Sequence, residues 1–408
     1  MPPSSAGRRE LARRLAAAVA AEHGSGQPLP TPLMAVDLDA FDLNAADLVR
    51  RAGGKPVRVA SKSVRVPRLL ERALGHDGIE GVLCFTLREA LWLYERGVSD
   101  DLVVAYPSID RASLTTLVSS PGAATAITVM IDDIAHLEII DSVRYSLAVP
   151  VRVAIDIDAG LRIGGQHVGP KRSPLHDPQQ VAALARQVVE RRGFQLVGVM
   201  TYEGQVAGLP DVVPTQRARS MIVRGLKQAS QTQVEVRRQQ VADALAGIVE
   251  LEFWNAGGSG SVQSTAEDPV VTEVAAGSGL LVPTLFDHYK SFEPRPAALF
   301  ALPVTRRPSA GIATVHGGGL VASGAAGRDR LPTPWIPEGL HLTALEGAGE
   351  VQTPLTGPMA SRLRVGDLVW FRHAKAGELF EHTNDVRLLA GDAFVETVET
   401  YRGLGLAF

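Results

Sequence analysis

The sequence predicts an α/β protein in which a closed (β/α)8 TIM barrel is followed by a separate, mostly antiparallel β-domain. Between residues 57 and 279, short apolar runs alternate with helix-like segments, and Gly-rich turns follow the last two runs. From about residue 290 the helical periodicity ends, and short β-like runs are separated by Gly and Pro. Buried strands that alternate with helices are typical of βαβ units and a parallel sheet.

The apolar runs have the length and composition of buried parallel strands. They are residues 57–61, 81–86, 101–106, 126–132, 151–158, 196–202, 251–258 and 272–279. Eight βα units over this length match a closed barrel. A doubly wound open sheet is the alternative, but its Gly-rich turn would follow the first strand rather than the last two.

We predict three segments along the chain. Residues 1–30 form an amphipathic helix, with Leu11, Leu15 and Val19 on one stripe, and a Pro-rich linker. Residues 31–289 form the barrel, beginning with a lead-in strand and helix, and residues 290–408 form the β-domain. A stretch with two prolines at 287–298 is the predicted join.

Composition excludes several classes of protein. The formal net charge of −3 gives no reason to expect nucleic acid or an anionic membrane as a partner. Cys84 is the only cysteine, so an internal disulfide and a thiolate metal cluster are excluded, and its apolar neighbours indicate a small buried side chain. No run is long enough to span a bilayer, and charges interrupt the N-terminal segment, unlike a signal peptide. We therefore expect a cytoplasmic protein.

Two turns rich in Gly and Ser lie where a barrel binds phosphate. Residues 255–265 follow the seventh predicted strand, and residues 275–280 follow the eighth. Barrel enzymes bind phosphate in these loops, where backbone N–H groups can approach it closely. Either turn alone is also typical of a hairpin or a linker, but the two together predict a phosphate site.

Lys62 ends the first predicted strand, at the same rim of the barrel. Alternation places Arg58 and Lys62 on one face, and since the valine face packs against helices, Lys62 should point into the barrel. Such a lysine either pairs with a phosphorylated substrate or forms a Schiff base with pyridoxal 5′-phosphate. Burial beside Arg58 and Arg65 would favour the neutral, nucleophilic amine. The alternative is a structural ion pair with Asp156 or Asp158.

Two further residues lie at this rim. Arg162, just past the fifth strand, could reach the phenolate oxygen of the cofactor, and Tyr202, ending the sixth, could cover its phosphate or its ring. Taken singly, each is more often a capping or packing residue. Glycines on both sides of Arg162 favour close approach of the backbone.

Together these residues resemble the fold-type III pyridoxal-phosphate enzymes of the D-threonine aldolase and D-serine dehydratase group, and within it the bacterial proteins called amino acid deaminase/aldolase. The resemblance runs from TPLMAVD at residue 31 to the C-terminal TYRG and implies an alanine racemase-like barrel. Its motifs are Arg58-x-x-x-Lys62-Ser63, the IDIDAGLRIGG stretch around Arg162, Tyr202-Glu203-Gly204-Gln205, the loop Gly257-Gly258-Ser259-Gly260, and Gly277 with Ser278 and Gly279 after it.

The resemblance implies that Lys62 holds pyridoxal 5′-phosphate as an imine, and that Arg58, Arg162, Tyr202 and the two turns bind it. It also implies a homodimer and chemistry on D-configured or unusual β-hydroxy-α-amino acids. The substrate amine would displace Lys62 to give an external aldimine. Then the Cα–Cβ bond breaks or forms, as in an aldolase, or the α-proton and β-hydroxyl leave, as in a dehydratase. Of these we favour the aldol chemistry.

One position departs from the family pattern. The family usually binds a divalent metal through a His and, two residues later, a Cys or Asp, but the matching residues here are His373 and Lys375. A protonated lysine is no ligand. Either Glu378, Glu381 or His382 completes a metal site, or Lys375 takes the place of the metal with His373 as general base. We favour the version without a metal.

Three other functions share parts of this pattern. An amino-acid racemase would carry Ala-Asn-Ala-Tyr-Gly after the lysine, where this chain has SVRV. A non-catalytic carrier of pyridoxal phosphate would lack the second domain. A phosphosugar Schiff-base aldolase would give a purified protein without yellow colour.

Overall fold

The computed structural model describes residues 5–26, 29–145, 149–207, 217–287, 289, 293 and 295–408. The chain forms two compact units. The barrel unit comprises Asp47–Lys62, Leu70–Gly277 and Phe408, and the sheet unit comprises Met1–Ala46, Ser63–Leu69 and Ser278–Ala407.

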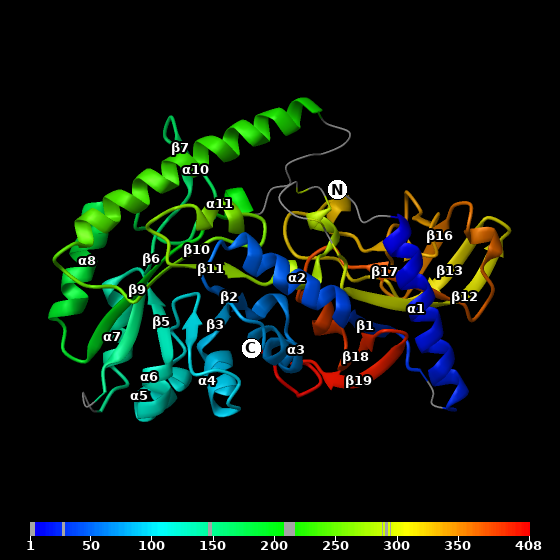
Figure 1. The fold of residues 1–408 in the computed structure, drawn as a ribbon, viewed down its shortest axis with the longest axis horizontal. Helices are drawn as coiled ribbons and strands as arrows, with labels where there is room; N and C mark the ends of the chain where they lie inside the picture. Colours follow the sequence, from blue (N-terminus) through cyan, green and yellow to red (C-terminus); the bar gives the residue numbers. More distant parts are fainter. Residues whose placement is uncertain are drawn as a thin grey trace. The chain divides into compact units, whose positions relative to one another are not determined.

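Within the described residues of the barrel unit, eight parallel strands close into a barrel in the order β10-β11-β2-β3-β4-β5-β6-β9 (Figure 1). They are β2 (Val57–Ala60), β3 (Ile79–Cys84), β4 (Leu102–Val104), β5 (Ile127–Ile131), β6 (Val151–Asp156), β9 (Phe194–Thr201), β10 (Phe253–Ala256) and β11 (Glu273–Ala276). Every predicted barrel strand is confirmed. Apolar side chains fill the interior, among them Val103, Met130, Ala154, Val197, Met200 and Phe253.

Helices connect the strands. They are α2 (Leu38–Arg51), α3 (Pro67–Leu74), α4 (Leu87–Glu95), α5 (Arg111–Ser119), α6 (Pro121–Ala126), α7 (Ile134–Asp141), α8 (Pro178–Glu190), α9 (Gly204–Ala207), α10 (Arg217–Leu245) and α11 (Val262–Ala266). Several begin at a side chain that accepts a hydrogen bond from the first turn: Thr86 caps α4, Asp133 caps α7 and Asp177 caps α8. Such caps satisfy N–H groups that have no partner inside the helix.

A two-stranded hairpin follows β6. It consists of β7 (Leu161–Ile163) and β8 (Gln166–Val168), and it precedes α8. This insertion was not predicted from the sequence. Because it follows the carboxyl end of a barrel strand, it belongs to the rim where barrel enzymes carry their active sites.

Nine strands of the described chain form a mixed, mostly antiparallel sheet in the sheet unit. They are β1 (Leu33–Asp37), β12 (Ala298–Ser309), β13 (Ile312–His316), β14 (Thr333–Ile336), β15 (His341–Leu342), β16 (Gln352–Thr356), β17 (Leu368–Arg372), β18 (Asp385–Ala390) and β19 (Ala393–Glu399). The β-domain prediction is therefore confirmed as a fold class. β1 pairs antiparallel with β12 and parallel with β18.

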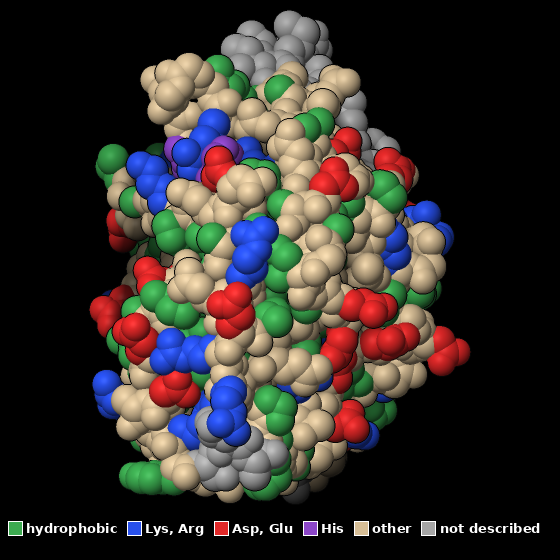
Figure 2. All heavy atoms as spheres, turned by 90° about the vertical axis from the view of Figure 1, so that its left-hand side faces the viewer, with side chains coloured by type: hydrophobic (Ala, Val, Ile, Leu, Met, Phe, Trp, Pro, Cys, Tyr) green, Lys and Arg blue, Asp and Glu red, His purple; other side chains and the backbone are tan. Residues whose placement is uncertain are grey.

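The N-terminal helix α1 (Ser5–Gly24) belongs to the same unit. Leu11 and Leu15 are buried in a cluster that includes Leu33, Leu299 and Trp370. The predicted apolar stripe is thus confirmed. In the described part of the chain, no helix combines the length and the apolar character needed to cross a membrane. On the face shown in Figure 2, cationic and anionic side chains are interspersed.

The division into units differs from the predicted segments 1–30, 31–289 and 290–408. β1 was predicted as the lead-in strand of the barrel, yet it pairs with β12 and β18 in the sheet unit. Residues from Ser278 onward also belong to the sheet unit. Residues 27–28 of the predicted linker, and residues 288, 290–292 and 294 of the predicted join, lie outside the described residues.

Candidate cofactor site and active site

Lys62 lies just beyond the carboxyl end of β2, in the 3-10 turn η1 (Ser61–Ser63). Its side chain is exposed, so the predicted burial is wrong, while its predicted direction into the barrel stays a prediction. The reason is that β2 ends at Ala60, and the alternation of a strand no longer applies two residues later. Nζ of Lys62 donates a hydrogen bond of 2.6 Å to Oη of Tyr106. The amine is thus at the rim of the barrel.

Two tyrosines and an arginine accompany this lysine, and together we call them the Lys62 cluster: Lys62, Tyr106, Arg172 and Tyr202. Tyr106 comes shortly after β4 and Tyr202 directly after β9, so both belong to the carboxyl rim. The guanidinium carbon of Arg172 lies 5.4 Å from the ring centre of Tyr106 and 5.1 Å from that of Tyr202. A cation over the face of an aromatic ring is electrostatically favourable.

Burial and the surrounding charges together shift the pKa values of the two phenols in opposite directions. Burial raises the pKa of Tyr106, but the positive charge of Lys62 and its hydrogen bond, aided by Arg172, outweigh burial and leave that pKa lowered. For Tyr202, burial raises the pKa and Arg172 offsets it only in part. Tyr106 is therefore the phenol that releases its proton more readily.

A buried carboxyl group at this rim also has a perturbed pKa. Asp156 is the last residue of β6, and burial raises its pKa to about 7, helped by the negative charge of Asp132. The positive charge of Arg172 acts in the opposite direction. Asp156 thus titrates near neutral pH.

The contacts of Arg58 do not support its predicted role in cofactor binding, and that role stays a prediction. Its Nε and one terminal nitrogen donate to Glu273, at 2.7 and 2.8 Å, and the other terminal nitrogen donates to Asp101 at 2.8 Å. Glu273 begins β11, and Asp101 immediately precedes β4, so these partners lie at the amino-terminal end of the barrel. The buried guanidinium therefore makes its ion pairs at the amino-terminal end of the barrel, whereas Lys62 lies at the carboxyl end. Its donors are used in ion pairs that hold the strands together.

The turn after β10 is shaped by a glycine and fixed by buried polar groups. Gly257 has a φ of 86°, a left-handed conformation that favours glycine. Oγ of Ser259 accepts a hydrogen bond from the backbone N–H of Gly277 at 3.2 Å, and the carbonyl of Ser259 accepts one from Arg51 at 3.0 Å. The turns that follow β10 and β11 are therefore joined. Gly258 and Gly260 lie on either side of Ser259, in a segment whose backbone can approach a ligand closely.

The buried carboxylate of Glu203 accepts hydrogen bonds that hold this turn in place. Its side chain is only 4% exposed, and its Oε2 accepts from the backbone N–H of Gly257 at 3.2 Å and from Arg238 at 2.9 Å. The hydroxyl of Thr265 also donates to it. Glu203 belongs to the Tyr202-Glu203-Gly204-Gln205 motif, so this motif connects the Lys62 cluster to the Gly-Ser turn.

Ser278 and Gly279 begin the short helix α12 (Ser278–Leu281), directly after Gly277 in the chain. Both residues belong to the sheet unit. Within that unit, Oγ of Ser278 lies 3.1 Å from Oγ of Ser63, the residue that follows Lys62 in the sequence.

Arg162 lies on β7 and is exposed. One of its terminal nitrogens donates to Oδ2 of Asp158 at 3.1 Å, and Nε2 of His167 lies 3.0 Å from Oδ1 of the same carboxylate. Asp158, which was a candidate partner for Lys62, is thus engaged by the hairpin. The expected role of Arg162 at the cofactor ring stays a prediction.

His373 follows β17 in the sheet unit and is buried. Neither of its ring nitrogens has a hydrogen-bond partner among the described residues. Burial, and then the neighbouring Arg372, lower its pKa to about 3, so the imidazole is neutral near neutral pH. Nζ of Lys375 donates to Ser323 at 2.5 Å and to Glu378 at 3.1 Å.

The described residues around His373 offer no ready set of three metal ligands. Among them, no group of three or more His, Cys, Asp or Glu side chains is arranged to hold a metal ion. Both acidic residues considered as further ligands already have partners: Glu378 contacts Lys375 and Ser323, and Glu381 pairs with Arg65. A metal ligand set that includes these carboxylates would require both ion pairs to break.

The described residues of the barrel unit do fit pyridoxal 5′-phosphate. An exposed primary amine lies at the carboxyl rim, and two joined Gly-Ser turns follow β10 and β11. A side chain at Gly257 would also approach Thr265 to 3.2 Å, so the turn is built for glycine. These are the groups that an aldehyde carried on a phosphate requires.

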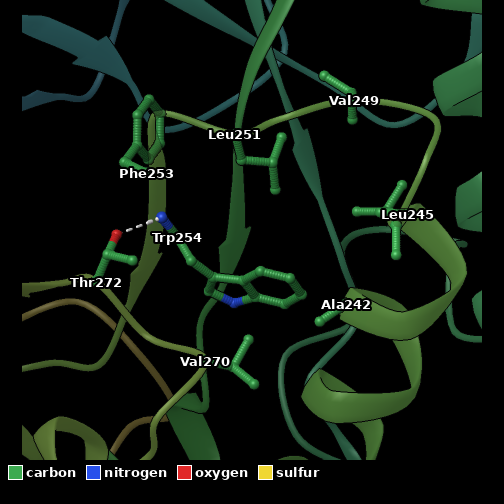
Figure 3. A pocket seen from close by; sticks show the side chains of 9 residues that line it. Ala242, Leu245, Val249, Leu251, Phe253, Trp254, Val270 and Thr272 are labelled. Atoms are coloured by element: carbon green, nitrogen blue, oxygen red, sulfur yellow. Dashed lines mark hydrogen bonds between the residues drawn. The ribbon is translucent and has the colours of Figure 1, made fainter.

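A cavity of about 250 Å³ lies away from this rim (Figure 3). Its lining comes from the end of α10, the loop before β10, the start of β10 and the loop before β11: Ala242, Leu245, Ala246, Val249, Leu251, Phe253, Trp254, Val270 and Thr272. The indole of Trp254 lies among aliphatic side chains in Figure 3. The two loops precede their strands, and the residues that line the cavity carry no ionisable side chain, so this cavity does not have the character of a reaction site.

Sequence analysis missed two residues of the Lys62 cluster. Tyr106 ends the predicted strand at 101–106, and a polar aromatic residue at the carboxyl end of a barrel strand is a signal that could have identified it. Arg172 follows the unpredicted hairpin, and no local pattern distinguishes it from other loop arginines.

Comparisons with known proteins agree with this architecture. The family model of the alanine racemase N-terminal domain matches residues 36–282. A D-threonine aldolase from Filomicrobium marinum is 19% identical, with a TM-score of 0.77, over 93% of this chain and 96% of that chain. D-threo-3-hydroxyaspartate dehydratase from Delftia sp. HT23 is 21% identical, with a TM-score of 0.70, over 91% of this chain and 97% of that chain.

An alanine racemase from Clostridium difficile 630 is also similar, at 14% identity and a TM-score of 0.64, over 91% of this chain and 99% of that chain. Similar structures of the dehydratase include a cysteine-to-alanine mutant in the metal-free form and a histidine-to-alanine mutant. No curated protein matches the sequence. At these identities, the structural likeness shows the fold alone.

Proposed function

The chain belongs to the alanine racemase N-terminal domain family, and from this premise we propose that it is a pyridoxal-phosphate-dependent lyase that acts on a β-hydroxy-α-amino acid, D-configured or otherwise unusual. This fold-type III family typically uses pyridoxal 5′-phosphate. We favour aldol chemistry, either cleavage to glycine and an aldehyde or its reverse. Dehydration to a keto acid and ammonia is the second candidate.

The observation that carries the proposal is the placement of an exposed amine and two joined Gly-Ser turns in one barrel unit. Lys62 supplies the amine, and its hydrogen bond to Tyr106 orients it at the rim. The backbone N–H groups around Gly258 and Gly260 and the hydroxyl of Ser259 would hold the phosphate. Tyr202 would cover the cofactor, and Arg162 would hold its ring oxygen.

When bound, the cofactor supplies an electron sink for the carbanion left when a bond to Cα breaks. The chain's own residues decide which bond that is, because they orient the substrate. Lys62 must give up a proton to become a nucleophile and take one up when it is released. The two turns fix the phosphate, so that the reacting atoms keep one position relative to the amine.

The names of similar structures support both candidate reactions. One is a D-threonine aldolase and another a dehydratase of a β-hydroxy amino acid. Racemization, suggested by the family name, has less support because SVRV follows Lys62 where a racemase would carry Ala-Asn-Ala-Tyr-Gly. The sheet unit, which contains more than a hundred residues, argues against a carrier role, because a carrier would lack a second domain.

We also propose that Lys375 takes the place of the second metal ligand. A lysine ammonium is a donor of up to three hydrogen bonds, and it can bind the β-hydroxyl of the substrate directly. The resemblance gives the role of base to His373, but burial lowers the pKa of this imidazole to about 3, which makes it a weak base near neutral pH, so the proposal rests on Lys375 alone. The resemblance further suggests a homodimer, which sedimentation of the purified protein would test.

The decisive experiment identifies products. Purified protein loaded with pyridoxal 5′-phosphate is incubated with a panel of D- and L-β-hydroxy amino acids, and products are identified by mass. Glycine plus aldehyde supports the aldolase, and keto acid plus ammonia supports the dehydratase. An inverted amino acid as the only product would contradict both.

The attachment site is tested separately. Borohydride reduction followed by peptide mass mapping is expected to place the cofactor on Lys62 alone. The variant Lys62→Ala should lose the yellow colour, whereas Lys171→Ala, at an exposed lysine of the same unit, should keep it. Label on another lysine would refute the assignment.

A further inference from the structure

Tyr106 contacts the atom of Lys62 that is expected to react. Its Oη accepts a hydrogen bond from Nζ at 2.6 Å, at the short end of charge-assisted hydrogen bonds. The amine also lies 5.3 Å from the centre of the Tyr106 ring. Tyr106 is half-buried while Lys62 is exposed.

Charged groups face this phenol from several elements. Lys62 after β2 and Arg172 after β8 are cationic and favour the phenolate. Asp156 at the end of β6 is the acidic group and acts against it. Tyr202 after β9 shares the Arg172 guanidinium with Tyr106. The cations prevail, because two of them lie close to the ring and Asp156 itself titrates only near neutral pH.

We propose that Tyr106 is a catalytic acid–base residue that accepts a proton from the Lys62 ammonium and returns it. The role in turnover rests on the proposed function, but the proton exchange itself does not. In the forward direction the pair starts as the Lys62 ammonium and the Tyr106 phenolate; one N–H bond of Lys62 breaks and an O–H bond forms on Tyr106. The products are a neutral amine and a neutral phenol.

This proton exchange explains how an exposed lysine can reach its neutral, nucleophilic form. Burial cannot favour its neutral form, because its side chain is in contact with solvent. A proton moved along an existing hydrogen bond leaves the total charge of the pair unchanged, so no new charge has to be solvated. Lys62 can thus become a nucleophile at neutral pH and can be reprotonated by the same group when it is released.

Arg172 acts in this scheme as a positioning residue. Its guanidinium lies over the rings of both tyrosines and so holds Tyr106 beside Lys62. Its charge also keeps the phenolate form accessible. We expect Arg172→Ala to weaken the effect of Tyr106 without abolishing it.

The test is a pH titration of phenolate absorbance in the full-length protein without added cofactor. The chain has six tyrosines, and one is expected to ionise below the ordinary value of about 10. Tyr106→Phe should remove this early step, and Lys62→Met should move it to higher pH. Tyr145→Phe, at a tyrosine that is 94% exposed, is the matched control and should keep it.

A second measurement follows the rate at which added pyridoxal 5′-phosphate attaches to Lys62. Tyr106→Phe should slow attachment at neutral pH by at least about tenfold, since a positioned acid–base group contributes factors of that order or more. An early step that survives in Tyr106→Phe, or one that is unmoved in Lys62→Met, would overturn the inference. Because neither readout needs turnover, the inference can stand if the lyase proposal fails, and can fail if that proposal stands.

Discussion

The backbone N–H of Gly277 donates a hydrogen bond to Oγ of Ser259, and the two atoms are 3.2 Å apart. Gly277 follows β11, and Ser259 lies in the turn after β10, so one side chain fixes the spacing of two neighbouring turns. Arg51 holds the same residue through its carbonyl group. A ligand that binds both turns therefore meets a preformed surface, and no loop has to become ordered first.

Ser259→Ala should weaken cofactor binding while leaving the fold intact. The substitution removes the hydroxyl that joins the turns, and a hydrogen bond of this kind contributes about 0.5–1.5 kcal/mol, which corresponds to a loss of affinity of up to about tenfold. A spectroscopic titration with pyridoxal 5′-phosphate measures the change. Ser264→Ala, in the helix that follows the turn, is the control and should bind the cofactor as wild type does. Equal losses in both variants would contradict the role given to Ser259.

Glu203→Gln should destabilise the protein strongly. The carboxylate is buried and pairs with Arg238 at 2.9 Å, so its neutralisation leaves a buried guanidinium only partly compensated by Asp268. Breaking a buried pair typically costs about 3–5 kcal/mol, and we expect the lower end of this range. Urea unfolding gives the value. The exposed pair of Arg152 and Glu252 offers the control: Glu252→Gln should change the free energy of unfolding by about 1 kcal/mol at most.

Asp156→Asn should change how stability depends on pH. The pKa of Asp156 is raised from its ordinary 3.8 to about 7 in the folded protein. Between these values the folded protein holds a proton that the unfolded chain has lost, so the contribution of this group to stability falls as pH rises and levels off above about pH 7. The fall is on the order of 4 kcal/mol at most.

The asparagine variant lacks this fall. Its free energy of unfolding relative to wild type should therefore increase between about pH 5 and about pH 8. Urea unfolding at both pH values checks this, with Asp100→Asn, at an exposed carboxylate, as the control that should parallel wild type. A constant difference between Asp156→Asn and wild type would show that Asp156 is ionised throughout.

Lys375→Ala should reduce activity far more than stability. The pair of Lys375 and Glu378 is partly exposed, so its loss should cost less than about 1 kcal/mol. If the ammonium binds the β-hydroxyl of the substrate, kcat/KM should fall by about a hundredfold or more. Steady-state kinetics on the substrate found in the product screen measures this, with Lys171→Ala as the control. Activity that is lost on exhaustive chelation and restored by one zinc or manganese per chain would refute the replacement of a metal by Lys375.

The barrel could be predicted from the sequence because its strands are buried on both faces. Such strands are near-continuous apolar runs, and each was bounded by a helix pattern or a Gly-rich turn. The position of the two Gly-Ser turns followed from the same count, since they come directly after the last two strands of the barrel, while their binding of phosphate stays a prediction. Glu203 and Ser259 were included through short motifs, but their contacts depend on which side chains the fold brings together.

Predictions from the sequence differed from the structure where the position of a side chain or strand depends on partners far away in the sequence, or on where a strand ends. Lys62 was expected inside the barrel because the strand was extended by two residues, whereas β2 ends at Ala60 and Lys62 is exposed. Arg58 was expected at the cofactor, but its long side chain reaches Glu273 and Asp101 at the other end. The segment Leu33–Asp37 is buried throughout and has the pattern of a barrel strand. Nothing within it encodes that its neighbours are β12 and β18.

The pairing of β1 with β12 and β18 makes the N-terminal and C-terminal parts of the chain depend on each other for folding. β1 lies between β12 and β18 in the sheet, so a fragment that starts near residue 290 would lack a central strand and leave two apolar edges unpaired. During synthesis, about 260 further residues must be made after β1 (ending at Asp37) before β12 (beginning at Ala298) is available, and more before β18 is. Truncation from the front should therefore cause the rear of the chain to aggregate, and excising either segment as an independent module should fail.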